Sequence, residues 1–290
     1  MLFFRFLSRL PLGALYGISN VLSFLLLHII RYRRLVILEN LRLSFPEKSP
    51  DELKLIARQF YLNLTDLLVE TLKMPDLTAD ELIRRVHFTN PGLVKARLKA
   101  GQTVVVMASH QGNWEWLPSA AVLIGMPADS VYKPLTNTFF EELMKQVRST
   151  FGAVPVPMQS LPRRMAAQKG KPRIIALVAD QVPNTPEQAY WTDFLHRDTP
   201  FYPGTERLAR SRNMPVFYVE VIRIRRGYYE ATFDLISEPP YDDLPLGTML
   251  ERYRDRLEAT IRNYPSDWLW SHKRWKHWRE KYGKISTKLE

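Results

Sequence analysis

The sequence contains no cysteine among its 290 residues. Disulfides, zinc sites built on thiolates and a cysteine nucleophile are therefore excluded. The six histidines show no HExxH or similar metal-ligand pattern, and the chain has no glycine-rich phosphate loop. Glycine is also scarce, with 12 residues against 21 prolines, which disfavours a nucleotide-binding enzyme. We expect a protein that uses neither a metal nor a bound cofactor.

The charge balance is strongly basic, with a formal net charge of +11 and a pI near 9.8. Such a balance implies an anionic partner or surface, and nucleic acid, anionic lipid and an acidic carrier protein all qualify. A chain of this length can bury a sizeable core. Because no internal repeat or low-complexity linker is visible, we predict one catalytic domain, residues 36–290, behind an N-terminal membrane anchor helix, residues 1–35.

The anchor prediction rests on residues 10–30, which carry no charged side chain. This length is close to the ~20 apolar residues that a helix needs to cross a bilayer. A dense basic group, Arg31, Arg33 and Arg34, follows directly. The positive-inside rule then places the rest of the chain in the cytoplasm. The helix either spans the membrane or lies in its interface; a buried core helix of a soluble protein is the alternative.

The most informative stretch is residues 103–116, TVVVMASHQGNWEW. Residues 103–108 are almost continuously apolar and β-branched, as in a buried strand, and a helix-compatible stretch begins at Trp114. His110 lies between the two, at the strand end where α/β sheets bind ligands. Glu115 is close enough to fold back onto the imidazole, so the pair could act as a general base. The alternative is a structural histidine beside a glutamate that complements the helix dipole.

A second buried run, residues 173–179, also ends in polar residues, Asp180-Gln181. Two such strands indicate one site at one edge of one sheet. Residues 183–200 lack a clear period, and we predict an irregular lid or membrane-facing loop there. Further strands are predicted at residues 130–134, 154–157, 215–224 and 227–236, the last two pairing antiparallel at the sheet edge.

These elements predict an α/β fold. Its centre is a mixed, largely parallel sheet flanked by helices, and a membrane-associated helix precedes it.

With these landmarks in order, the chain resembles the bacterial lipid A late acyltransferases, the lauroyl and myristoyl transferases of lipopolysaccharide assembly. They belong to the lysophospholipid acyltransferase-like superfamily, and the resemblance covers nearly the whole chain. Its core is the H-x4-(D/E) motif, met by His110 and Glu115. The further matches are Tyr132-Lys133-Pro134, Arg148, Asp180-Gln181 and the closing stretch 268–275, WLWSHKRW.

The resemblance implies acyl transfer from a thioester to a lipid hydroxyl, at the cytoplasmic face of the inner membrane and without a metal. His110 would act as the general base, and Glu115 would orient it. Arg148 would suit a phosphate on the donor or the acceptor, because a guanidinium binds phosphate oxygens bidentately. Asp180 would orient a neighbouring group. The remaining residues expected to support the site or contact substrate are Lys133 and Asn113.

The donor that the resemblance implies is an acyl carrier protein thioester, whose acidic protein suits a basic enzyme. Acyl-CoA is the alternative donor. The implied acceptor is a phosphorylated glycolipid, the lipid A precursor, and no nucleic-acid partner is expected. Three other functions stay open: the same transfer to another glycolipid, aminolipid or lysophospholipid; a hydrolase acting on an acyl thioester; and a non-catalytic basic membrane protein that binds lipid.

Overall fold

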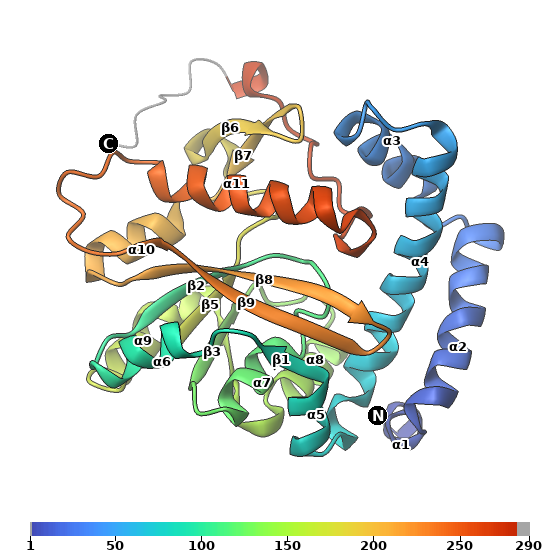
Figure 1. Ribbon diagram of the computed structural model, residues 1–290, viewed down its shortest axis with the longest axis horizontal. Coiled ribbons are helices and arrows are strands. Elements are labelled where there is room, and N and C mark those ends of the chain that lie inside the picture. The colour runs from blue at the N-terminus through green and yellow to red at the C-terminus, as the bar shows by residue number, and fades with distance from the viewer. Residues whose placement is uncertain (1, 283–290) are drawn as a thin grey trace.

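The computed structural model describes residues 2–282, and a seven-stranded sheet lies at its centre (Figure 1). The strand order is β1 (Val86–Phe88), β9 (Tyr228–Ser237), β8 (Val216–Arg225), β2 (Val104–Ala108), β5 (Ile174–Val178), β3 (Ala128–Tyr132) and β4 (Val154–Pro157). All neighbours from β8 to β4 are parallel, whereas β9 runs antiparallel to β8. The predicted mixed, largely parallel sheet is therefore confirmed.

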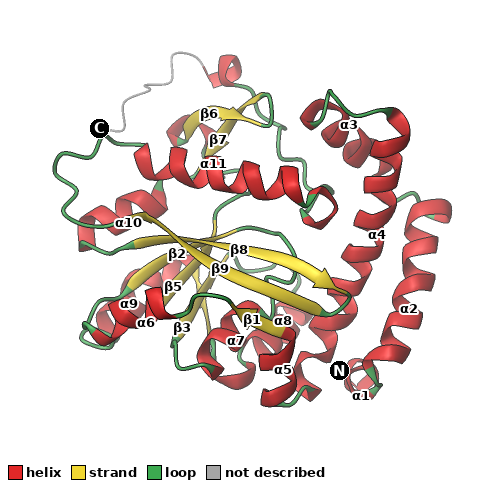
Figure 2. Cartoon of the chain, in the orientation of Figure 1, coloured by secondary structure: helices red, strands yellow, loops and turns green. Residues whose placement is uncertain are grey.

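Helices cover both faces of this sheet (Figure 2). They are α1 (Leu2–Arg9), α2 (Leu12–Phe24), α3 (Arg34–Ser44), α4 (Pro50–Lys73), α5 (Ala79–Arg85), α6 (Gly92–Lys99), α7 (Leu117–Leu123), α8 (Thr138–Arg148), α9 (Leu161–Ala167), α10 (Gly204–Arg212) and α11 (Thr248–Asn263). Because strand side chains alternate between faces, β2 sends Val105 and Met107 into one core layer and Val106 and Ala108 into the other. In Figures 1 and 2, α11 lies above the sheet and α7 below it.

The N-terminal apolar stretch is helical, as predicted. α2 continues through a π-helical turn, and Leu12–Ile29 is long and apolar enough to cross a membrane by length and composition. One face, including Leu15 and Ser19, is buried where α2 packs along α4 (Figure 1). The other face exposes apolar side chains such as Val21 and Phe24.

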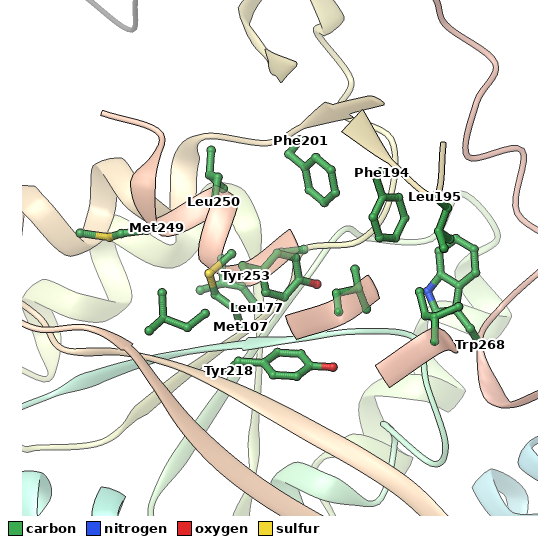
Figure 3. Close-up of a cluster of buried hydrophobic side chains, with 14 of the residues drawn as sticks. Met107, Leu177, Phe194, Leu195, Phe201, Tyr218, Met249, Leu250, Tyr253 and Trp268 are labelled. Atoms are coloured by element: carbon green, nitrogen blue, oxygen red, sulfur yellow. The ribbon is translucent and has the colours of Figure 1, made fainter. Parts of the chain in front are cut away.

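Two predictions about the second half of the chain are wrong. Residues 190–201 form a hairpin, β6 (Tyr190–Phe194) and β7 (Arg197–Phe201), instead of an irregular loop. Its Phe194 and Phe201 are fully buried in the core that also holds Trp268 (Figure 3). In addition, β9 is not the edge of the sheet, because the short strand β1 pairs beyond it.

The domain boundaries predicted above stay a prediction, and residues 283–290 of the predicted catalytic domain lie outside the described residues. The aromatic C-terminal segment packs into the protein: Trp268, Trp270 and Arg274 are almost fully buried. The backbone of Trp268 also forms a bridge with Gln111, beside the predicted site. This segment therefore meets the core rather than projecting from it.

Candidate active site

His110 lies in the loop of residues 109–116, here called the catalytic loop, which connects β2 to α7. Its backbone N–H donates to Asp180 Oδ2 at 2.9 Å, and its ring Nδ1 lies 2.7 Å from Asp180 Oδ1. Asp180 follows β5, and the parallel register that pairs Ala108 with Val178 brings the two strand ends together. The predicted meeting of two polar strand ends at one edge is therefore confirmed.

The Asp180 carboxylate is almost completely buried. Its Oδ2 also accepts a hydrogen bond from the Trp268 indole Nε1 at 2.8 Å. Burial alone would raise the pKa of Asp180, but the charge of His110 and the hydrogen bonds from His110 and Trp268 lower it below its ordinary value. An ionised Asp180 can only accept a hydrogen bond, so His110 Nδ1 carries the proton and donates it to Oδ1 as a hydrogen bond, and the lone pair of the neutral ring is on Nε2.

Glu115 does not contact the imidazole, so the predicted His110–Glu115 contact is wrong. Its carboxylate receives two hydrogen bonds from Arg148, Nε to Oε2 at 2.8 Å and Nη2 to Oε1 at 2.7 Å. The physical reason is local, because the chain becomes helical only at Leu117 and the loop before it turns Glu115 toward the end of α8. Asp180, from the neighbouring strand, occupies the position beside the ring.

The Glu115–Arg148 ion pair is largely buried. Burial lowers the pKa of the Arg148 guanidinium, but the hydrogen bonds and charge of Glu115 outweigh it and raise that pKa overall. The guanidinium also lies over the Tyr132 ring, 5.3 Å from its centroid. Bidentate geometry and the aromatic contact hold the cation in one orientation.

A cavity of about 570 Å³ brings these groups together. His110, Glu115 and Arg148 line it, and its volume is typical of a binding site for a small ligand or a chain segment. Lys133 lines the cavity as well, and its Nζ donates to Asn184 Oδ1 at 2.9 Å. Part of the apolar lining comes from one face of the sheet and from α7, and this part includes Val106, Ala108, Ala176, Val219, Phe233, Phe88, Leu117 and Ala121.

A histidine bonded to a buried carboxylate and a largely buried ion pair therefore lie beside one apolar cavity. A family model described as bacterial lipid A biosynthesis acyltransferase matches residues 1–277. The chain belongs to this family. Membership makes it an acyltransferase of lipid A synthesis, and the match contains every site residue described above. No individual curated protein matches the chain.

Asn113 serves this acyltransferase differently from the cavity residues. It is fully buried and lies outside the cavity lining. Its Nδ2 donates to Glu70 Oε2 at 2.7 Å, and its Oδ1 accepts the Trp116 backbone N–H at 3.0 Å. Asn113 therefore holds the buried side of the catalytic loop in place through these two hydrogen bonds.

Three neighbours of the acyltransferase site were not among the predicted site residues: Gln181, Trp268 and Glu70. The Gln181 side-chain nitrogen lies 3.0 Å from His110 Nε2, and both residues line the cavity. For Glu70 the sequence does hold a signal, since Asp66 and Glu70 recur at helical spacing within an apolar stretch of α4. Two acids on one face of a buried helix need partners, which points to a buried polar network.

Proposed function

We propose that this acyltransferase moves a fatty acyl chain from an acyl carrier protein thioester to a hydroxyl of a lipid A precursor. One observation carries the proposal: His110 is oriented by a buried carboxylate, at 2.7 Å, and lines an apolar cavity. A positioned neutral imidazole is a suitable general base for an alcohol near neutral pH. The apolar lining gives the acyl chain a place beside that base.

The transfer needs no covalent enzyme intermediate and no metal. The oxygen of the acceptor hydroxyl attacks the thioester carbonyl carbon while His110 Nε2 takes the hydroxyl proton. Asp180 offsets the positive charge of the imidazolium that forms. When the tetrahedral intermediate collapses, the C–S bond breaks and the proton on Nε2 passes to the thiol sulfur. The ester bond replaces the thioester, and the histidine returns to its starting state.

Arg148 is the group proposed to meet negative charge in this reaction. Two of its donors bind Glu115, and a guanidinium has five N–H groups, so donors remain for an oxyanion or a phosphate oxygen. Under this proposal Glu115 acts through Arg148, holding it over the cavity. Lys133, near the same cavity, adds a second cation for a phosphate on the donor or the acceptor.

The strand order suggests how the acyl chain lies. Lys133 follows β3, on one side of β2, whereas Phe233 and Phe88 belong to β9 and β1, on the other side. The two phenylalanine rings stack at 5.4 Å between centroids. We place the polar part of the donor toward Lys133 and the end of the acyl chain toward this aromatic pair.

The proposed location is the cytoplasmic face of the inner membrane. The apolar helix Leu12–Ile29 supports membrane association, and exposed Arg31, Arg33 and Arg34 follow it, suited to anionic headgroups. The net charge of +11 also favours an acidic carrier protein as the donor.

Mass spectrometry of the acceptor lipid tests the proposal. The full-length enzyme in lipid vesicles is incubated with a phosphorylated glucosamine disaccharide lipid and either acyl carrier protein thioester or acyl-CoA. We expect the acceptor to gain one acyl group with the carrier-protein donor. Thioester consumption at the same rate without acceptor would favour a hydrolase, and an unchanged donor in both arms would favour the lipid-binding protein.

Gly112, in the catalytic loop, provides a test of loop geometry in the same assay. Its φ is +60°, and a Cβ there would meet Val221 Cγ1 at 3.0 Å and the Val221 carbonyl oxygen at 3.2 Å. Gly112→Ala should therefore displace the loop and lower kcat at least about tenfold, because misplacing reacting groups by an ångström costs about 10²-fold.

Gly101→Ala is the matched control for this variant. Its φ is +82°, and nothing lies within 4 Å of a Cβ at that position. Both alanines adopt an unfavourable φ, which lowers the free energy of unfolding by about 1–2 kcal/mol. Only Gly112→Ala should affect kcat; equal kcat values for the two variants would contradict the role assigned to the loop.

A further inference from the structure

Glu70 of α4 is fully buried and joins three separate parts of the chain. Its Oε1 accepts the Tyr16 hydroxyl of α2 at 2.9 Å. Its Oε2 accepts Asn113 Nδ2 of the catalytic loop and the Tyr229 hydroxyl of β9, each at 2.7 Å. One carboxylate therefore links the N-terminal apolar helix to the loop that carries His110.

The loop side of this link is closely constrained. Asn113 lies between His110 and Glu115 in the sequence, and its Oδ1 accepts a hydrogen bond from the Trp116 backbone N–H. The Trp116 indole in turn donates to the Glu70 backbone carbonyl at 3.0 Å. The loop segment from Asn113 to Trp116 is therefore hydrogen-bonded to Glu70 at both of its ends.

The helix side of the link is specific to Tyr16. Ser19, one turn further along α2, also bonds to α4, but its partners are Thr65 at 2.9 Å and Asp66 at 2.5 Å. Asp66 pairs with Arg223 and Arg226. Those arginines belong to β8 and the following turn, and the Ser19 hydroxyl bonds to α4 without bonding to Glu70 or Asn113.

We propose that Glu70 is a positioning residue that couples the seating of the N-terminal helix on α4 to the geometry of the catalytic loop. With Tyr16 in place, all three donors fix the buried carboxylate in one orientation. When the helix moves away from α4, the Glu70 side chain loses one of the three hydrogen bonds that fix its orientation, and its hydrogen bond with Asn113 is held less firmly. The inference rests on the proposed function, because it assigns the loop a catalytic role.

The decisive comparison is Tyr16→Phe against Ser19→Ala, with the full chain in lipid vesicles. Each variant removes one hydroxyl through which α2 donates a hydrogen bond to α4. Tyr16→Phe should raise amide hydrogen exchange of residues 109–116 and lower kcat, each by about fivefold, as expected for one lost hydrogen bond. KM should stay unchanged, because neither Tyr16 nor Glu70 lines the cavity. Ser19→Ala should leave both readouts at the wild-type value.

A second pair of variants tests Glu70 itself. In Glu70→Gln the amide oxygen can still accept from Asn113 and Tyr229, and its NH₂ can donate to the Tyr16 oxygen. Glu70→Gln should therefore keep kcat within about threefold of wild type, whereas Glu70→Ala should lose at least tenfold. A kcat near the wild-type value in Glu70→Gln, together with a large loss in Glu70→Ala, would show that the side chain acts by positioning the loop and not through its charge.

Equal loop exchange in Tyr16→Phe and Ser19→Ala would overturn the coupling, whatever the activity. Exchange that responds to Tyr16→Phe alone, in a protein that transfers no acyl group, would support the coupling and reject the proposed function. A wild-type enzyme that transfers acyl groups, with kcat equal in both variants, would keep the function and reject the coupling.

Discussion

His110→Ala should abolish acyl transfer, and Asp180→Asn should lower kcat by about 10³–10⁴-fold while leaving the fold intact. The asparagine retains the shape of the aspartate, so the effect has a defined cause. Asp180 Oδ2 accepts from the His110 backbone N–H and from the Trp268 indole. Because both donors need an acceptor, the amide oxygen of the substituted side chain must occupy the position of Oδ2.

The amide nitrogen of this variant then faces His110 Nδ1, where Oδ1 stands in the wild type. Because that nitrogen is a donor, it favours the tautomer with its proton on Nε2. Such an imidazole has no lone pair toward the cavity and cannot take the acceptor proton. The KM values for the acyl donor and for the acceptor lipid should change little, because the cavity keeps its shape.

Steady-state kinetics with the carrier-protein donor, alongside a thermal melt, measures this outcome. Asp129→Asn is a suitable control, because Asp129 is equally buried and pairs with Arg164 and Arg173 instead of a histidine. The control should lose stability while its folded fraction retains kcat. An Asp180→Asn enzyme within tenfold of wild type would exclude the His110–Asp180 pair as the base.

The position of the His110–Asp180 pair could be predicted from the sequence, but which carboxylate joins His110 could not. The apolar runs before His110 and Asp180 each indicate a buried strand, and parallel neighbours end at the same edge. What the sequence does not determine is which carboxylate reaches the ring. Glu115 is nearer along the chain, but Asp180 is nearer in space because β5 pairs directly with β2. Trp268, which also bonds to Asp180, comes from the far end of the chain, and its place beside Asp180 follows from the tertiary fold and not from its neighbours in sequence.

The hairpin of residues 190–201 was missed for a different reason. Its turn, Leu195-His196, has positive φ at both residues, 51° and 64°. Hairpin turns of this kind normally carry asparagine, aspartate or glycine, so neither residue marks a turn in the sequence. The structure tolerates them because Phe194 and Leu195 are buried in the core (Figure 3). Tertiary packing therefore overrides the local preference.

Arg148→Met should lower kcat by about 10²–10³-fold, the size found when one donor to a developing oxyanion is removed. It removes the cation over the cavity and leaves Glu115, with only 9% of its side chain exposed, without its positively charged partner. Removing one member of a buried pair also destabilises the fold, by about 3–5 kcal/mol. Thermal melts are needed beside the kinetics, so that kcat is referred to folded enzyme.

Glu115→Gln separates the two roles considered for Glu115. If it acts through Arg148, the amide oxygen still accepts one guanidinium hydrogen bond, the cation stays in place and kcat should fall only about tenfold. If it orients the imidazole, the loss should match that of Asp180→Asn. The double variant Glu115→Gln/Arg148→Met should resemble Arg148→Met alone, because the effects of residues that act as one unit do not add. An additive double variant would mean that Glu115 serves the reaction independently of Arg148.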